Sequence, residues 1–406
     1  MTVLNAELPP TVLPELQDQA DAMRAFRRDI HAHQELCFQE ERTAELIAKT
    51  LRNWGIEVHT DLGKTGVVGV IKGRPGKRAI GLRADMDALP MTEHNTFAHA
   101  SRHPGRMHAC GHDGHTAMLM AAAQHLAAKR DFDGTVYLVF QPAEEGGGGA
   151  REMIKDGLFD EFPMEAMFGA HNWPGMKAGQ FALKSGPVFA SSNEFKITLR
   201  GKGSHAAMPH LGVDPVPAAC QLVTAFQTIV SRNKRPIDPG VISVTMIHAG
   251  EATNVVPDSV VLEGTVRTFT LELLDLLERR MKDMTEQLAG AFELTAEFEF
   301  RRNYPPTINH AAETDFARRV LTDMVGADNV QEFEPTMGAE DFSYYLLEEP
   351  GCYFLIGNGD GEHRTGGHGL GPCTLHNPSY DFNDELIPLG GSMWVRLAEA
   401  WLNQPR

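Results

Sequence analysis

Two short motifs carry residues that could work together on a metal ion. Cys110 and His112 stand two positions apart, and a thiolate and an imidazole can both bind one borderline-soft divalent cation. The adjacent carboxylates Glu144 and Glu145 follow downstream. One of two neighbouring glutamates can bind a metal while the other moves protons. This combination indicates metal-assisted hydrolysis.

Three further residues extend the set of ligand types. Glu145 follows a β-rich run, His171 follows an apolar run, and His376 stands in a Leu-His-Asn-Pro segment. We expect all three at strand ends, where functional residues gather in α/β sheets. With Cys110 and His112 they supply one sulfur, three imidazoles and one carboxylate, enough for two cations if one group bridges. Cys110 and His112 alone would be equally consistent with a buried free cysteine beside a surface histidine.

Glu144 is the expected general base of such a centre. Metal binding lowers the pKa of a water from about 15.7 to about 7, but a nearby group must still take the proton and pass it to the leaving nitrogen. The alternative is a glutamate that only caps a loop or faces solvent. The position of Glu144 beside a candidate ligand and before four glycines favours catalysis. Cys110 precedes a helix predicted over 113–129, whose free N–H groups favour a thiolate.

Composition limits the expected partners and compartment. The 406 residues carry 37 Lys+Arg against 54 Asp+Glu, a net charge of -17. Such a surface repels phosphate backbones and anionic lipid, so we expect neither nucleic-acid nor membrane partners. The five scattered cysteines are typical of a reducing compartment. Residues 1–14 lack a signal-peptide pattern and the apolar segment 117–128 is too short for a membrane span, so we expect a cytoplasmic protein.

Alternating strands and helices predict an α/β first domain. Strand-like runs occupy 66–71, 79–83 and 135–140, and helices are predicted over 21–33 and 113–129. This order favours a largely parallel sheet with functional loops beyond the strand ends. The chain is also too long for one simple core, so a second domain is expected.

From about residue 190 the pattern changes to the β-α-β-β-α-β order of a ferredoxin-like domain. The predicted elements are a strand at 195–200, a helix at 216–230, strands at 241–247 and 260–266, an amphipathic helix at 273–291 and a strand at 292–300. We therefore expect residues 1–190 and 305–406 to form a catalytic, metal-binding domain. Residues 191–304 are expected to be an inserted α+β domain.

Six ordered motifs resemble those of one enzyme family. They are ADMDALP at 84–90, HACGHDGH at 108–115, QPAEE at 141–145, GSHAAMPH at 203–210, NVVPD at 254–258 and MGAEDF at 337–342. The chain resembles the aminoacylase-type metallopeptidases, in the branch of hippurate hydrolases, N-acyl-L-amino acid amidohydrolases and auxin (IAA)-amino acid conjugate hydrolases. The resemblance covers nearly the whole chain. It implies a zinc-exopeptidase-like catalytic domain with an inserted lid and dimerisation domain.

The resemblance also implies roles for individual residues. The positions that match metal ligands of this branch are Cys110, His112, Glu145, His171 and His376. Glu144 matches the general acid/base, and Asp87 matches a carboxylate that supports the ligands. For Asp85 a structural role is at least as well supported. The family pattern implies two divalent ions per subunit, zinc or manganese first and cobalt or nickel as alternatives.

Three matches fall in the inserted domain. His205 matches a histidine that reaches the active site of the partner subunit in relatives and donates to the developing oxyanion, which implies a homodimer. Asn254 and Arg267 match positions that hold the substrate's carboxylate or carbonyl, although Arg267 is equally consistent with a solvated strand position. Two positions depart from the family pattern: Gln34 replaces a common proline, and Cys37, which we interpret as packing, replaces a small residue.

The expected reaction is hydrolysis of a small N-acyl amino acid to a carboxylic acid and a free amino acid. An N-carbamoyl-amino acid hydrolase or a dipeptidase would use the same centre on a different acyl group. A non-catalytic small-molecule-binding homologue is a more remote alternative. It would be favoured by loss of a ligand or of Glu144, and neither is lost.

Overall fold

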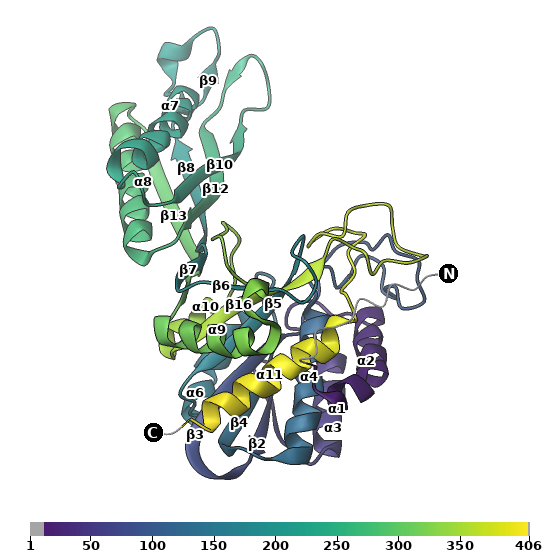
Figure 1. The fold of residues 1–406 in the computed structure, drawn as a ribbon. Coiled ribbons are helices and arrows are strands. Elements are labelled where there is room, and N and C mark those ends of the chain that lie inside the picture. The colour runs from purple at the N-terminus through teal and green to yellow at the C-terminus, as the bar shows by residue number, and fades with distance from the viewer. Residues whose placement is uncertain (1–11, 405–406) are drawn as a thin grey trace. The chain divides into compact units, whose positions relative to one another are not determined.

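The computed structural model describes residues 12–404, and the chain divides into two units (Figure 1). Unit 1 comprises Met1–Gly186, Asn309–Glu334 and Tyr344–Arg406, and unit 2 comprises Pro187–Ile308 and Pro335–Ser343. The chain passes between the units in β7 (Gly186–Phe189) and β14 (Thr307–Asn309), which pair with each other, and again after Glu334 and after Ser343.

Unit 1 is a mixed α/β unit. The helices that lie wholly or mostly in it are α1 (Pro14–Asp18), α2 (Ala20–Ala32), α3 (Glu41–Asn53), α4 (His112–Lys129), α5 (Gly149–Lys155), α6 (Leu158–Glu161), α9 (Ala311–Val325), η3 (Ala327–Asn329), α10 (Ser343–Glu348) and α11 (Leu386–Leu402). Its strands are β1 (Glu57–Leu62), β2 (Gly66–Lys72), β3 (Arg74–Asp85), β4 (Asp133–Gln141), β5 (Met167–Pro174), β6 (Phe181–Leu183), β15 (Val330–Glu332) and β16 (Gly351–Gly359).

The strands of unit 1 form one sheet in the order β1-β2-β4-β3-β5-β16-β6-β15. The central strands β4, β3, β5 and β16 run parallel, whereas the β1–β2, β2–β4 and β16–β6 pairs are antiparallel. The outer pair β6–β15 is also parallel, so the expectation of a largely parallel sheet holds except at β1, β2 and the β16–β6 pair. A short connection joins β1 to β2 as an antiparallel hairpin.

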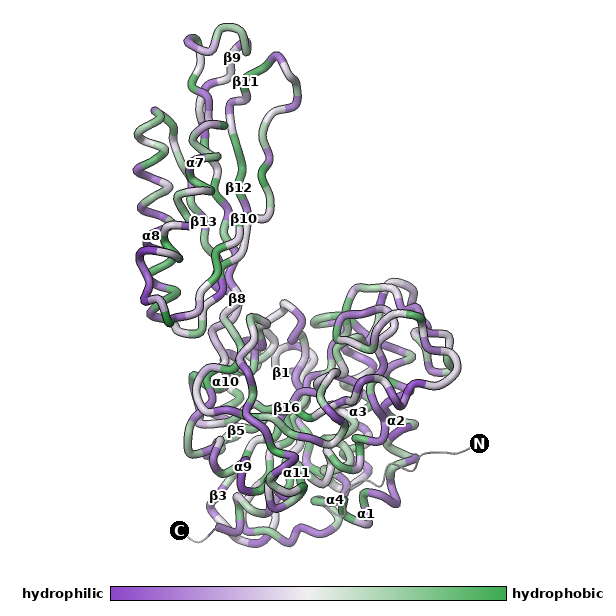
Figure 2. The backbone as a smooth tube through the Cα atoms, turned by 45° about the horizontal axis from the view of Figure 1, so that its top comes forward, coloured by the Kyte–Doolittle hydropathy of each residue, from purple (hydrophilic) through white to green (hydrophobic). Residues whose placement is uncertain are grey.

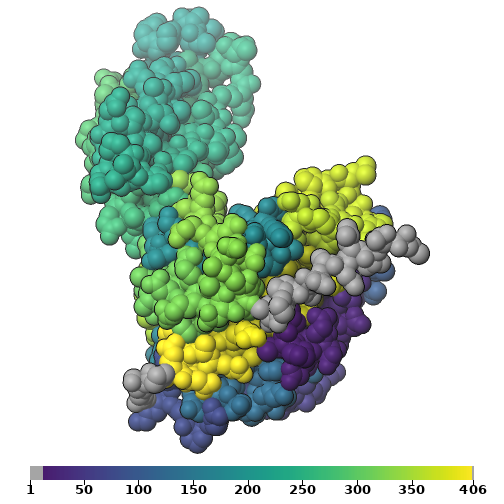
Figure 3. Space-filling model, in the orientation of Figure 1, coloured from purple at the N-terminus to yellow at the C-terminus, as the bar shows by residue number. Residues whose placement is uncertain are grey.

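Helix α4 lies in the middle of the core of unit 1. It packs on β3, and α2 and α11 pack on it in turn, so residues 117–123 are buried on every side of the helix. At Gly114 a side chain could not fit, because a Cβ atom would lie 2.3 Å from the ring of Phe382. On the face shown in Figure 3, the C-terminal segment (yellow) lies beside the N-terminal helices (purple), in agreement with contacts between α11 and α1.

Unit 2 is a four-stranded antiparallel sheet with two long helices. Its elements are β8 (Ser192–Arg200), β9 (Ser204–His205), η1 (Pro209–Leu211), α7 (Pro215–Thr228), η2 (Ile229–Asn233), β10 (Gly240–Ala249), β11 (Val255–Val256), β12 (Ser259–Thr268), α8 (Leu271–Ala291) and β13 (Thr295–Tyr304). The sheet order is β10-β12-β8-β13. Along the chain its four strands and two long helices follow the predicted β-α-β-β-α-β order.

Helix α8 shows why this sequence folds against the sheet of unit 2. Leu273, Leu277 and Met281 recur at helical spacing and are buried in the core of the unit. The Thr270 hydroxyl begins the helix by accepting a hydrogen bond from the Leu273 N–H. Hydrophilic and hydrophobic stretches alternate along α8 in Figure 2, as in an amphipathic helix. No helix within residues 12–404 has both the length and the apolar character needed to cross a bilayer.

Candidate metal centre

The parallel strands of unit 1 bring the candidate ligands to one edge of the sheet. Asp85 at the end of β3 lies opposite Gln141 at the end of β4, so the segment after β4 continues beside that after β3. In the β3–β5 pair, Arg83 lies opposite Gly169, which places His171 level with Asp85. His171 therefore lies within β5 and not beyond its end, because β5 continues to the edge that carries the site. This correction does not change its position among the other ligands.

Cys110, His112 and His171 form the first cluster. All three are buried, and their ligand atoms lie within 4.8 Å of one another. The Cys110 Sγ and the His171 Nε2 are 3.3 Å apart. The His171 Nδ1 lies 2.7 Å from the carbonyl oxygen of Asn172, so Nδ1–H donates there and Nε2 keeps its lone pair. Among the described residues the buried Nε2 of His112 has no hydrogen-bond partner. Such a donor set suits zinc or another borderline cation.

Cys110, Glu145 and His376 form the second cluster. The His376 Nε2 lies 3.1 Å from the Glu145 carboxylate. His376 stands in a turn and not at a strand end, with a left-handed backbone (φ +58°) and its N–H donating to the Ala109 carbonyl. A strained backbone of this kind persists where surrounding contacts hold it, often at functional sites. The two clusters share the Cys110 sulfur, which is the geometry a bridging ligand needs.

The surroundings of Cys110 favour its neutral thiol unless a cation is close. Burial raises the pKa of Cys110 well above its usual range, and the Glu145 and Glu144 carboxylates raise it further. The expectation that free N–H groups at the start of α4 would favour a thiolate is therefore wrong for the chain alone, because burial and negative charge outweigh them. A divalent cation would reverse this balance by binding the thiolate directly.

The two buried imidazoles differ in their surroundings. Burial lowers the pKa of His171 well below its ordinary value, and the nearby His115 lowers it further, so this ring is a neutral ligand. Burial also lowers the pKa of His112, but the carboxylates of Asp85 and Asp87 outweigh it and raise that pKa to about 10. A cation bound at the His112 Nε2 would replace the proton and take over the attraction of these carboxylates.

Asp87 connects His112 to the two glutamates. Its carboxylate lies 3.2 Å from the His112 Nδ1 and accepts hydrogen bonds from the backbone N–H groups of Glu144 and Glu145. Burial alone would raise the pKa of Asp87, but the hydrogen bond and charge of His112, together with the Glu145 N–H, keep it below its ordinary value. Asp87 therefore orients an imidazole and holds the turn that carries both glutamates.

Asp85 belongs to a second buried network. It binds the His115 Nδ1 at 2.6 Å and the Arg83 guanidinium at 2.7 Å. The His115 Nε2 lies 2.7 Å from the side-chain oxygen of Asn172, the residue whose carbonyl receives the His171 N–H. Asp85 thus supports His171 through other residues. Asn172 was not among the predicted site residues, and no motif marks it.

Cys37 has a polar role that the sequence did not indicate. Its thiol lies 3.2 Å from the Asp87 carboxylate and 3.0 Å from the Glu145 carbonyl oxygen, so it can donate to either. The interpretation of Cys37 as packing was therefore incomplete, because the segment that carries it turns toward the glutamates. All five cysteines are free thiols.

The three remaining candidates belong to unit 2. His205 is exposed in β9, and its Nδ1 accepts a hydrogen bond from the Ala207 N–H. Asn254 lies close by, since its carbonyl accepts from the Ala206 N–H. Arg267 is half-buried in β12 and lines an open hollow on the sheet of this unit. The structure thus brings His205 and Asn254 together and places Arg267 elsewhere in the unit.

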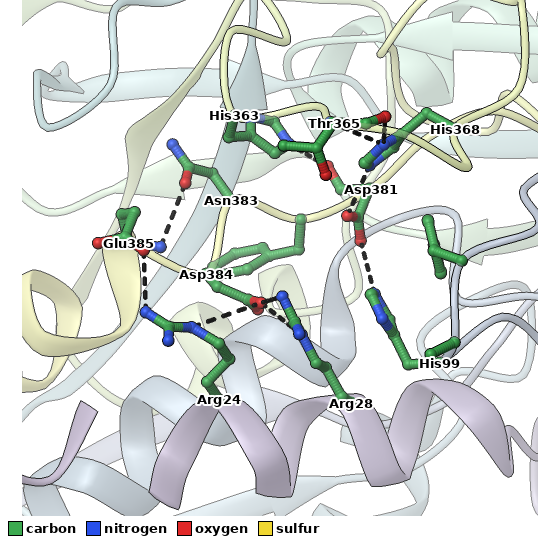
Figure 4. A pocket seen from close by; sticks show the side chains of 13 residues that line it. Arg24, Arg28, His99, His363, Thr365, His368, Asp381, Asn383, Asp384 and Glu385 are labelled. Carbon is green, nitrogen blue, oxygen red and sulfur yellow. Dashed lines mark hydrogen bonds and ion pairs between the residues drawn. The ribbon is translucent and has the colours of Figure 1, made fainter. Parts of the chain in front are cut away.

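A pocket of about 440 Å³ lies in unit 1 beside the segment that follows His376 (Figure 4). Arg24 and Arg28 reach into it from α2 and pair with Glu385 and Asp384. None of the candidate metal ligands lines this pocket. Its charged side chains instead join α2 to the segment before α11.

Comparisons with known proteins identify relatives of this chain. The model of peptidase family M20/M25/M40 matches residues 81–400. A hippurate hydrolase from Campylobacter jejuni is 38% identical, over 96% of this chain and 99% of that protein. An N-acetyl-L-cysteine deacetylase from Bacillus subtilis is 42% identical, over 95% and 88%. The solved YXEP protein from Bacillus subtilis, described as a dinuclear metal binding peptidase of the M20 family, has a TM-score of 0.82 and 31% identity, over 96% and 99%.

These similarities confirm the α/β fold class and the family resemblance inferred from the motifs. The relatives align with nearly the full length of the chain, so the similarity extends well beyond the ligand motifs. The chain belongs to peptidase family M20/M25/M40.

Proposed function

We propose that this chain is a metal-dependent amidohydrolase that cleaves N-acyl amino acids into a carboxylic acid and a free amino acid. Two relatives of nearly full length are named for acylated amino acids, as a hippurate hydrolase and an N-acetyl-L-cysteine deacetylase. One observation carries the proposal: two three-residue ligand clusters share Cys110, and the buried carboxylate of Glu144 lies beside them, grouped with His112 and Glu145.

Two divalent cations fit these residues, zinc or manganese first. Cys110, His112 and His171 would hold one, and Cys110, Glu145 and His376 the other. The His112 Nε2, which has no hydrogen-bond partner among the described residues, and the lone pair of His171 support this assignment. When bound, the cations would polarise the scissile carbonyl and lower the pKa of the attacking water.

Glu144 is the proposed proton carrier. Its backbone N–H is held by Asp87, which fixes where its side chain begins. The Glu144 carboxylate would take a proton from the attacking water and pass it to the nitrogen of the departing amino acid. A general acid/base of this kind contributes about 10²–10⁴-fold to the rate.

The test combines a substrate panel with one substitution. The metal-reconstituted protein should hydrolyse N-benzoyl or N-acetyl amino acids in preference to N-carbamoyl amino acids and dipeptides. Glu144→Ala should lower turnover by about 10²-fold or more while keeping the wild-type metal content, because each of the two clusters that share Cys110 keeps all three of its residues in this variant. Wild-type turnover in this variant would remove Glu144 from the mechanism. Preference for a carbamoyl or dipeptide substrate would favour the alternative hydrolases.

Unit 2 is proposed to complete the site of a second copy of the chain. We propose that the chain is a homodimer, that His205 donates to the oxyanion in that copy, and that Asn254 and Arg267 bind the substrate's carboxylate or carbonyl. The exposure of the His205 side chain supports this role. A Glu144→Ala chain mixed with a His205→Ala chain should recover about a quarter of wild-type activity, because half the dimers are mixed and each has one intact site. No recovery would mean that His205 does not act across copies.

A further inference from the structure

The segment Ala143-Glu144-Glu145, called the acid turn below, is held through its backbone by two carboxylates. The Ala143 N–H donates to the Glu40 carboxylate at 2.9 Å. The N–H groups of Glu144 and Glu145 donate to the Asp87 carboxylate at 3.1 and 3.0 Å. Three consecutive N–H groups thus end on carboxylate oxygens, so the positions of these oxygens hold the backbone of the acid turn.

Burial and hydrogen bonds to both oxygens hold the Glu40 carboxylate in place. Its side chain is fully buried just before α3. The oxygen that accepts from Ala143 also accepts from the Phe38 N–H, and the other oxygen accepts from the Thr65 hydroxyl at 2.7 Å. Within the same turn of chain, the Cys37 thiol lies 3.0 Å from the carbonyl oxygen of Glu145. The segment 37–40 therefore touches the acid turn at both of its ends.

The backbone of the acid turn needs such support. Ala143 has φ +54°. This left-handed backbone conformation is energetically unfavourable for a residue that has a Cβ atom. Ala143 is buried, so without an acceptor its N–H would remain unsatisfied away from water. Loss of the Glu40 oxygen would favour a relaxed backbone at Ala143. Because Glu144 and Glu145 follow directly, both of their side chains would move.

We propose that Glu40 is a positioning residue of the active site, whose carboxylate fixes the acid turn and through it places Glu144 and Glu145. Glu40 is not itself a ligand or a proton carrier, since it reaches neither cluster. This inference rests on the roles proposed above for Glu144 and Glu145. Glu40 would act through the position of its acceptor oxygen and not through its negative charge.

Two substitutions distinguish the effect of the length of the Glu40 side chain from the effect of its negative charge. Glu40→Gln keeps the length of the side chain and an acceptor oxygen for the Ala143 N–H, so kcat should stay within about threefold of wild type. Glu40→Asp keeps the charge but shortens the side chain by one methylene. It should lower kcat for N-benzoylglycine by about tenfold to a hundredfold, the effect of a displacement near 1 Å, with KM changed much less. In Co²⁺ titrations Glu40→Asp should weaken the second ion, which needs Glu145, and leave the first unchanged.

Glu35→Asp is the matched control for a purely structural effect. Glu35 also accepts from backbone N–H groups in the first turn of α3, those of Arg42 and Thr43, but it has no hydrogen bond to the acid turn. It should lower the melting temperature and leave kcat and both Co²⁺ affinities unchanged.

Three results would overturn the inference: wild-type kcat in Glu40→Asp, equal loss in Glu40→Gln, or equal loss in Glu35→Asp. A wild-type protein inactive on every acylated amino acid would instead refute the proposed function. The Co²⁺ titrations would still test the role of Glu40 in that case, because they need no substrate.

Discussion

Arg27→Met should destabilise unit 1 severely. The Arg27 guanidinium is fully buried and bonds to three carboxylates, those of Asp384 at 2.8 Å, Asp381 at 2.9 Å and Asp113 at 3.1 Å. Asp113 follows the candidate ligand His112, and Asp381 and Asp384 lie in the segment after His376. Arg27 therefore joins α2 to two of the segments that carry candidate ligands.

The size of the destabilisation follows from the burial of Arg27 and of its three carboxylate partners. Removing one partner of a buried ion pair costs about 3–5 kcal/mol, and here three buried carboxylates lose their shared cation. Each carboxylate keeps a second basic partner, so the free energy of unfolding should fall by about 3–5 kcal/mol, a large part of a typical total stability of about 5–15 kcal/mol. Methionine keeps most of the side-chain length, so little packing is lost. Arg24→Met on the same helix should cost only about 0–1 kcal/mol, because its close partners Asp21 and Glu385 are exposed and its contact with Asp384 is long, at 3.9 Å.

The difference in the free energy of unfolding between wild type and Arg27→Met should depend on pH. Burial alone would raise the pKa of Asp381, but Arg27 outweighs it, and with His368 holds that pKa well below its ordinary value. A depressed carboxyl pKa stabilises the fold above the unfolded pKa of about 3.9, and this stability is lost as the pH falls through the folded pKa. The difference between wild type and Arg27→Met should therefore shrink as the pH falls below about 3.9, toward the folded pKa of Asp381.

Urea unfolding followed by tryptophan fluorescence measures this effect in unit 1 specifically. All four tryptophans of the chain lie in that unit: Trp54, Trp173, Trp394 and Trp401. A loss below about 1 kcal/mol at pH 6 would refute the argument, since that is the size of an exposed ion pair. An equal loss at low and neutral pH would refute the assignment of the effect to carboxylate charge.

Two further substitutions test the ligand set and the core. Cys110→Ser should lower the bound metal, measured by elemental analysis, from two ions to fewer than one per chain, because both clusters lose the shared thiolate. Substitution of the exposed Cys220 by serine is the control. Two ions retained in Cys110→Ser would exclude Cys110 as a bridging ligand. Gly114→Ala should destabilise unit 1 by about 1–3 kcal/mol in calorimetry, because its Cβ would overlap the ring of Phe382. Gly290→Ala in α8 should instead stabilise unit 2 by about 0.5–1 kcal/mol, because nothing lies within 4 Å of the added atom; equal effects at the two glycines would contradict the packing argument.

Local sequence was sufficient for the parts of the site that lie within one motif. Cys110 and His112 share the start of α4, and Glu144 and Glu145 share one turn after β4, so their proximity follows from their spacing alone. The strand and helix order of unit 2 was also readable, because each element carries its own hydrophobic periodicity. Residue types determined which chemistry these motifs could support.

Tertiary structure decided how the motifs meet and what holds them. The register of β3, β4 and β5 sets His171 level with Asp85, and packing determines that Cys110 serves both clusters. The partners of the acid turn come from segments far apart in sequence, so no local pattern could identify Glu40 as the acceptor for Ala143. The protonation states of Cys110 and Asp381 also could not be predicted from the sequence, because burial and neighbouring charges, and not residue type, shift their pKa values.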